Sequence, residues 1–130
     1  MRFTEPSMVS NCAKPSDFNE SLIVSPNFRD GYRNNQNCWW KIRAEHGQII
    51  ELKIEKFKVE YSTGCLYDSL QLYDGQNSSS QTLLGRKLCG WARYIPDIFR
   101  TTGNHLYLEF RSDSTRIEPG FKIAYSFKGK

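Results

Sequence analysis

The sequence has no run of about 18 apolar residues, which is the length that a membrane-spanning helix needs. Its first residues also lack the apolar core of a secretory signal, so the leader of an exported protein would lie outside this sequence. Closely spaced cysteines of the Cys-x-x-Cys type are absent, which argues against a thiolate zinc site. No convincing helical period is present either. These absences leave a globular chain without a transmembrane segment, in which strands are the expected elements.

Catalytic motifs are also lacking. The two histidines, His46 and His105, belong to no His-Glu-x-x-His zinc motif, and the chain has no nucleophile elbow. A Ser-His-Asp set can assemble from distant positions, and Glu60 and Asp68 could form the carboxylate pair of a glycosidase. Nothing in the sequence indicates a substrate cleft beside them, so we expect a protein that is not an enzyme.

The net charge is +4, from 18 Lys and Arg residues against 14 Asp and Glu residues. The basic residues are spread along the chain, which does not indicate a nucleic-acid footprint but leaves a glycosaminoglycan or another anionic surface as a partner. Ordinary solvated surface is the alternative for these residues. Those on outward faces of expected strands are Lys41, Arg43, Lys53, Lys56 and Lys58.

The cysteines are far apart in the sequence, and this favours two disulfides over a metal site. Disulfides are typical of oxidising compartments, and four cysteines allow three pairings. Glycosylation sequons begin at Asn19 and Asn77, which agrees with export from the cell. We therefore predict a protein that is secreted or forms part of an ectodomain. The four cysteines are Cys12, Cys38, Cys65 and Cys89.

Short segments that alternate apolar and polar residues predict strands. The alternation is clearest from Ile50 to Ile54, where one face should be buried and the other wet. The phase slips before Phe57, so we expect a β-bulge near residues 55–56. Further strands are predicted over residues 22–24, 38–43, 70–72, 105–110 and 121–127.

The remaining segments are expected to be connections. Residues 1–11 show no periodicity and should form an N-terminal tail, followed by a single domain over residues 12–128. Residues 45–48 should form a hairpin-like turn. Many short strands separated by turns predict an all-β fold, namely an antiparallel sandwich of two sheets.

Acidic residues stand beside the turns that connect these strands. Glu60 and Asp68 flank one turn, and Asp113 opens a later loop. Carboxylates on either side of a turn can converge in space, and hard cations such as Ca²⁺ take oxygen ligands placed in this way. Separate solvent-exposed acids are the alternative interpretation.

Several motifs, in order and spacing, resemble the CUB domain family. They cover nearly the whole chain from Cys12 to Phe127. The first are Ser25-Pro26-Asn27-Phe28 with Tyr32, and Cys38-x-Trp40-x-Ile42. The central ones are Ile50-x-Leu52-x-Ile54-x-x-Phe57-x-Val59-Glu60, Cys65-x-Tyr67-Asp68-x-Leu70 and Tyr73-Asp74-Gly75. The last are Leu84-Gly85-Arg86, Cys89-Gly90, Gly103-Asn104-x-Leu106-x-Leu108-x-Phe110, Ser112-Asp113 and Gly120-Phe121.

The resemblance implies a jelly-roll-like β-sandwich in an extracellular protein, with the sequential disulfides Cys12–Cys38 and Cys65–Cys89. Many CUB domains bind one Ca²⁺ in loops at one end of the sandwich. The matching ligands here are Glu60, Asp68 and Asp113, with backbone oxygen near Ser114. Tyr32 matches a residue that holds one carboxylate through its hydroxyl group.

The resemblance also suggests what such a site would do, because calcium sites of this family often receive a Lys or Arg side chain from a protein partner. The first hypothesis is therefore a recognition module that docks a basic side chain beside Ca²⁺. The second is a calcium-independent module for glycosaminoglycans or other glycans, using Lys53, Lys56 and Lys58. The third is a structural spacer within a larger protease or receptor.

Overall fold

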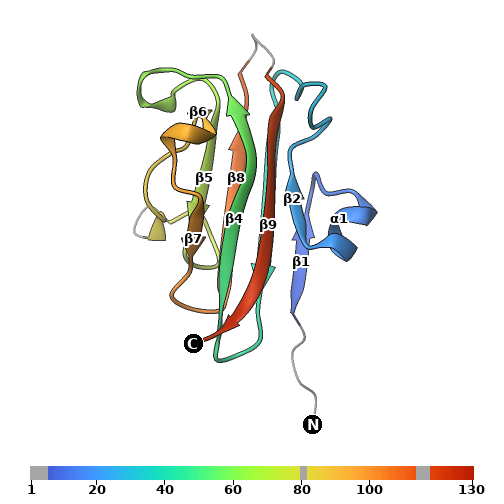
Figure 1. Cartoon of the computed structure of the whole chain (residues 1–130), viewed down its shortest axis with the longest axis vertical. Helices are drawn as coiled ribbons and strands as arrows, with labels where there is room; N and C mark the ends of the chain where they lie inside the picture. The colour runs from blue at the N-terminus through green and yellow to red at the C-terminus, as the bar shows by residue number, and fades with distance from the viewer. Residues whose placement is uncertain (1–5, 80–81, 114–117) are drawn as a thin grey trace.

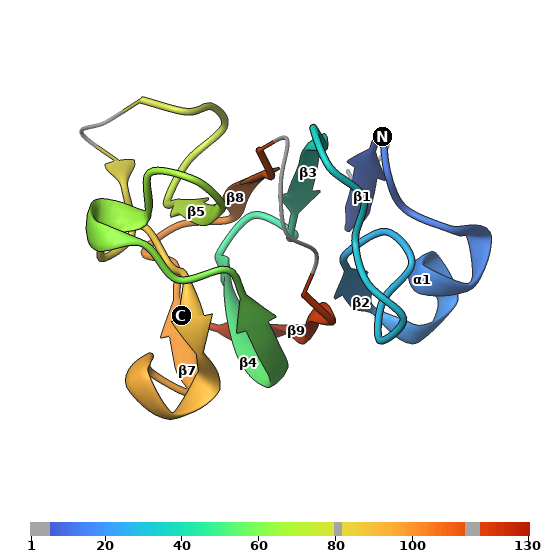
Figure 2. The same ribbon diagram turned by 90° about the horizontal axis from the view of Figure 1, so that it is seen from above.

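The computed structural model describes residues 6–79, 82–113 and 118–130. Within these ranges the strands form two antiparallel sheets packed face to face (Figures 1 and 2). One sheet has the strand order β1-β3-β8-β5, and the other has the order β2-β9-β4-β6, with β7 also paired to β4. The elements are β1 (Ser7–Ser10), α1 (Pro15–Glu20), β2 (Leu22–Val24), β3 (Asn37–Arg43), β4 (Gln48–Val59), the 3₁₀ helix η1 (Thr63–Cys65), β5 (Ser69–Tyr73), β6 (Gly90–Trp91), the 3₁₀ helix η3 (Ala92–Tyr94), β7 (Ile98–Arg100), β8 (His105–Arg111) and β9 (Gly120–Gly129).

Strand β4 follows the alternation of its sequence. Apolar side chains at every second position from Ile50 to Ile54 are buried between the sheets, whereas the residues between them face outward. The pairing with β9 shifts register between Ile54 and Lys56, which confirms the expected β-bulge. After the bulge Phe57 and Val59 occupy the buried face. The extra residue therefore sets the direction in which the chain leaves β4.

Aromatic side chains fill the middle of the core. The ring centroids of Trp40 on β3 and Phe121 on β9 lie 5.9 Å apart, so they link the two sheets. Phe110 on β8 packs edge-on against Phe121, with centroids 5.2 Å apart. The ring of Tyr32, from the loop after β2, packs edge-on against Phe110 at 4.9 Å. This aromatic cluster therefore extends from the centre of the sandwich to the loops at one end.

The disulfides are Cys12–Cys38 and Cys65–Cys89, which is the sequential pairing, and no cysteine is free. The first joins the segment after β1 to strand β3. The second joins η1 to the residue before β6. In the chain-entropy model each such loop closure stabilises the fold by about 3–4 kcal/mol.

Two expectations about the connections are wrong. Residues Ser7–Ser10 are not part of a tail but form β1, which pairs with β3 in the register Met8 to Ile42. Met8 is the one buried residue of this short edge strand, and a single buried position shows no period in the sequence. The turn at residues 45–48 exists but is no hairpin, because β3 and β4 belong to different sheets.

The short elements α1, β6 and β7 were not expected, since none spans enough residues to show a period. Among the described residues, no helix has the length and apolar character needed to cross a membrane.

The loop at residues 25–32 is fixed against the start of β9. The Phe121 N–H donates to the hydroxyl oxygen of Ser25 at 2.9 Å, and the Ser25 N–H donates to the Phe121 carbonyl at 3.1 Å. Further along, the Tyr32 N–H donates to the Glu118 carbonyl at 3.2 Å. The backbone of this loop is therefore held at several points, and these contacts place the Tyr32 side chain in the core.

Gly120 allows this close approach. It has φ +103°, and a Cβ atom there would lie 2.0 Å from the Ser25 Oγ. We expect Gly120→Ala to lower the free energy of unfolding by roughly 2–4 kcal/mol, because backbone strain and overpacking add. Urea unfolding measures this. Gly103→Ala is the control, since its Cβ would meet no atom within 4 Å. Equal stability of the two variants would contradict the prediction.

Candidate metal centre

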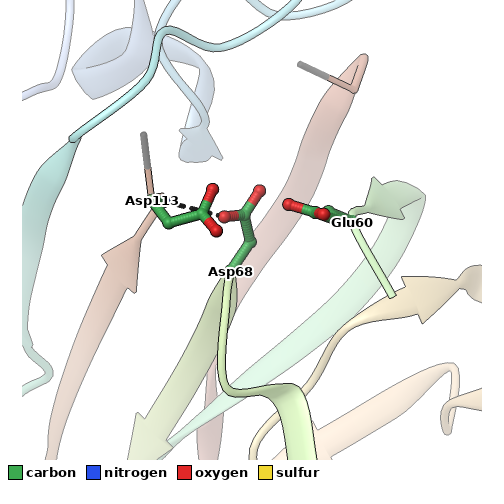
Figure 3. A group of neighbouring side chains, drawn as sticks. All are labelled: Glu60, Asp68 and Asp113. Atoms are coloured by element: carbon green, nitrogen blue, oxygen red, sulfur yellow. Dashed lines mark hydrogen bonds between the residues drawn. The ribbon is translucent and has the colours of Figure 1, made fainter. Parts of the chain in front are cut away.

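Three carboxylates converge at one end of the sandwich. Glu60 follows the last residue of β4, Asp68 precedes β5, and Asp113 follows β8. The pairing of Ser69 with Arg111 aligns the start of β5 with the end of β8, which brings the adjoining acids together. One carboxylate oxygen of each acid lies within 4.8 Å of the others. Figure 3 shows Asp68 between the other two, with the carboxylates directed toward one another.

Asp68 is the buried member of the cluster, with 0% of its surface exposed. The Tyr32 hydroxyl donates a hydrogen bond to its Oδ2 atom. The backbone N–H of Asp113 donates to its Oδ1 atom at 2.8 Å. Both oxygens of the buried carboxylate are therefore oriented by hydrogen bonds, as a buried charge requires.

Tyr32 connects this cluster to the core. Its side chain is fully buried, and its hydroxyl oxygen also accepts a hydrogen bond from the Glu60 N–H at 3.1 Å. Burial raises the pKa of Tyr32 above its ordinary value, and the hydrogen bond to Asp68 raises it further. The hydroxyl therefore keeps its proton and acts as a donor to Asp68. Tyr32 is also the residue that the CUB resemblance matches to this position, and its role beside a cation stays a prediction.

The electrostatics of the cluster favour a positive ion. Burial is the main cause that raises the pKa of Asp68, and the negative charge of Asp113 raises it further. The hydrogen bonds from Tyr32 and from the Asp113 backbone oppose this rise. Three carboxylates so close together repel one another unless a cation neutralises them. The donor set, which is made of oxygen atoms, fits a hard cation such as Ca²⁺. Ser114, the fourth expected ligand position, lies outside the described residues.

The basic residues do not form one surface. Lys53, Lys56 and Lys58 are exposed on β4, whereas Lys41 and Arg43 belong to β3 in the other sheet. Because the two sheets pack through their inner faces, the outward side chains of β3 and β4 point to opposite sides of the sandwich. A glycan-binding face that includes all five residues is therefore excluded, and the three lysines on β4 remain as a separate set.

Both glycosylation sequons lie on the surface. Asn19 is exposed in α1, and Asn77 is exposed in the loop after β5. Glycosylation at these positions stays a prediction that their exposure allows.

Sequence reasoning missed a cleft beside the cluster. A surface cleft with a volume of about 750 Å³ lies between the segment after β4 and the segment around β6, and none of the three carboxylates lines it. The signal that could have found it is the number of large apolar side chains at loop positions, where strand patterns do not require them. Its walls include Tyr61, Cys65, Arg86, Lys87, Trp91 and Tyr94.

Known proteins resemble this chain in sequence. The chain is 36% identical to human Tolloid-like protein 1 over 117 residues, which are 90% of this chain and 11% of that protein. It is 35% identical to the exoskeleton protein RP43 of Riftia pachyptila, over 96% of this chain and 30% of that protein. It is also 35% identical to Cubilin of Canis lupus familiaris, over 80% of this chain and 3% of that protein. The chain thus spans about a tenth or less of several relatives.

Solved structures resemble the fold. The full extracellular region of zebrafish Gpr126/Adgrg6 matches with a TM-score of 0.72 and 27% identity, over 84% of this chain and 14% of that chain. The crystal structure of the MASP-1 CUB2 domain bound to Ca²⁺ matches with a TM-score of 0.67 and 24% identity, over 80% and 88% of the two chains. The family model described as "CUB domain" matches residues 12–125. The sandwich, the disulfide pairing and these matches agree, and the chain belongs to the CUB domain family.

Proposed function

We propose that this chain is a non-catalytic, extracellular recognition module that binds one Ca²⁺ and docks a Lys or Arg side chain of a protein partner. CUB domains are modules of extracellular proteins that typically mediate protein interactions and are not catalytic themselves. The observation that carries the proposal is the convergence of Glu60, Asp68 and Asp113 within 4.8 Å. The Ca²⁺ bound in the MASP-1 CUB2 crystal structure supports the choice of ion.

The ion would supply positive charge between carboxylates that otherwise repel. Glu60, Asp68 and Asp113 would hold it, while Tyr32 and the Asp113 N–H keep the Asp68 carboxylate oriented. Because Ca²⁺ takes six to eight oxygen ligands, the three acids leave room for further oxygens. Extracellular calcium modules typically bind with dissociation constants of about 10⁻⁴–10⁻³ M, so occupancy would follow the calcium concentration of the medium.

Carboxylates fixed in this way are acceptors for a basic side chain. Glu60 and Asp113 are partly exposed, whereas Asp68 is buried, so the two outer acids present the surface that a partner can reach. A Lys or Arg side chain would form charge-assisted hydrogen bonds there, which are about twice as strong as neutral ones. The ion and the partner would then stabilise the same arrangement of side chains.

Two other functions rest on specific observations. The three exposed lysines of β4 support a calcium-independent module for glycosaminoglycans. The small share of Tolloid-like protein 1 that the chain covers supports a spacer within a larger protein. We propose that the domain includes β1 as well as residues 12–128, because β1 pairs with β3.

Calcium titration by calorimetry tests the ion site. We expect one saturable site in the wild type, and free Ca²⁺ at about 100 times its dissociation constant should add about 2.7 kcal/mol to the free energy of unfolding. Asp68→Asn should abolish binding at millimolar calcium, because it removes the charge of the central acid. Asp97→Asn, an exposed acid before β7, is the control and should bind as wild type does. Absence of binding in the wild type would reject the ion site.

The pH dependence follows from the raised pKa of Asp68. Without a cation, Asp68 in the folded chain stays protonated at pH values above 3.8, the ordinary pKa of this group. Its protonation therefore stabilises the folded state at low pH, and this stabilisation is lost as the pH rises through the raised pKa. Calcium competes with this proton. Its affinity should therefore fall up to about tenfold per pH unit as pH is lowered through the raised pKa. Calorimetry in buffers of different ionisation enthalpy measures the released proton, and no proton release in this range would contradict the assignment.

A lysine-coupled matrix tests the docking of basic side chains. We expect the wild type to be retained in calcium and released by EDTA. Its net charge of +4 opposes non-specific retention on a positively charged matrix, so retention would report the acidic site. Glu60→Gln should lose retention, and Asp97→Asn should keep it. Retention that survives EDTA would contradict the mechanism. Binding to a heparin matrix that survives EDTA and is lost in Lys56→Glu would instead favour the glycosaminoglycan function.

A further inference from the structure

A second surface lies beside the carboxylate cluster and is chemically its opposite. It is the cleft of about 750 Å³ lined by Tyr61, Cys65, Arg86, Lys87, Trp91 and Tyr94, which we call the aromatic cleft. One wall is formed by residues 61–65, and the other by residues 86–94, which include β6 and η3 on the left of Figure 1. None of the three clustered carboxylates lines it.

The walls of the aromatic cleft are tied together. The disulfide Cys65–Cys89 joins the two walls covalently. The Arg86 Nη2 donates a hydrogen bond to the Tyr94 carbonyl at 3.0 Å, which fixes η3 against the segment before β6. Both links are independent of the carboxylates. The cleft is therefore preformed, and a ligand would lose little free energy in ordering it.

The side chains at its rim are large and exposed. Tyr61 is 69% exposed, Tyr94 is 58% exposed and Trp91 is 47% exposed. The ring centroids of Trp91 and Tyr94 lie 6.0 Å apart, and the rings are tilted by 43° to each other. Together the two rings form an apolar surface at the rim. Exposed aromatic side chains grouped around a concave surface are typical of binding sites, where Trp and Tyr contribute most of the energy.

The charge of the aromatic cleft selects the kind of ligand. Arg86 and Lys87 line it, and Arg93 lies over the ring of Tyr94 at 5.7 Å. Among the described residues that line the cleft there is no Asp or Glu. The site is thus positive where the neighbouring cluster is negative, and it complements a ligand that carries both an apolar group and a carboxylate.

The described lining has no Asp, Glu, Asn or Gln side chain to accept hydrogen bonds from sugar hydroxyls, and this argues for a peptide rather than a sugar. A saccharide presents hydroxyl groups on most of its ring and needs several hydrogen-bonding partners. The hydroxyl group of Ser62 in the lining already accepts a hydrogen bond from the Tyr67 N–H at 3.1 Å. Aromatic surface with cationic groups at one side suits an apolar side chain next to an acidic one.

We infer that the aromatic cleft binds an acidic peptide segment of a partner protein. A large apolar or aromatic side chain of that segment lies between Tyr61, Trp91 and Tyr94, and an adjacent carboxylate pairs with Lys87. This binding goes beyond the proposed calcium function and does not require the ion, because the cleft and the cluster share no side chain.

Selection from a phage-displayed library of random dodecapeptides, carried out in EDTA, tests the inference. We expect the enriched peptides to carry Asp or Glu beside Phe, Trp, Tyr or Leu. Synthetic copies, measured by fluorescence anisotropy, should bind at least about tenfold more weakly to Lys87→Glu and to Tyr94→Ser. Their affinity should also fall as salt is raised.

Matched variants separate this site from general effects of charge and exposure. Lys53→Glu makes the same charge change on β4, and Tyr67→Ser removes an exposed ring outside the lining, so both should change affinity less than about twofold. Equal unfolding midpoints in urea show that all four variants fold.

Enrichment without acidic residues, no enrichment, or equal losses in the controls would overturn the inference. The inference would also be overturned if no peptide is enriched and a heparin octasaccharide binds to the wild type but not to Lys87→Glu. Because EDTA removes Ca²⁺, the result does not depend on the proposed ion site.

Discussion

The burial of the Asp68 carboxylate is the constraint on which this end of the sandwich depends. Removing a carboxylate from solvent raises the free energy of the folded state unless hydrogen bonds or a cation stabilise the charge. The Tyr32 hydroxyl and the Asp113 N–H supply the hydrogen bonds, and the fixed position of Tyr32 in turn comes from its ring contact with Phe110. The glycine at position 120 lets the loop of Tyr32 approach β9 closely. The acidic cluster is thus supported by the aromatic core, and a change far from the carboxylates can disturb it.

The segment at residues 61–67 separates two surfaces of opposite charge. Its ends adjoin Glu60 and Asp68, and its residues 61–65 line the aromatic cleft. The disulfide at Cys65 holds the middle of the segment independently of its ends. The two proposed partners, a basic side chain and an acidic peptide, would therefore bind on either side of one short loop without competing for the same side chains.

The local chemistry of the sequence was sufficient for the long strands. The alternation in β4 predicted its buried face and its bulge, because a shift of one residue moves an apolar side chain to the other face of a sheet. The same reasoning failed for β1, where one buried residue, Met8, defines the inner face. It also failed for the turn at residues 45–48, since a turn has the same composition whether it closes a hairpin or connects two sheets.

The sequence by itself determined the all-β class, the family, and the acids and the tyrosine of the candidate site, since these depend on periodicity and on motifs that are local in the chain. The tertiary structure alone decided which groups meet. It placed the carboxylates of Glu60, Asp68 and Asp113 within 4.8 Å and placed the lysines of β4 on a different sheet from Lys41. It also assembled the aromatic cleft from segments before and after β5. The physical reason is that strand pairing and the packing of the two sheets join residues distant in sequence, and no local pattern encodes those distances.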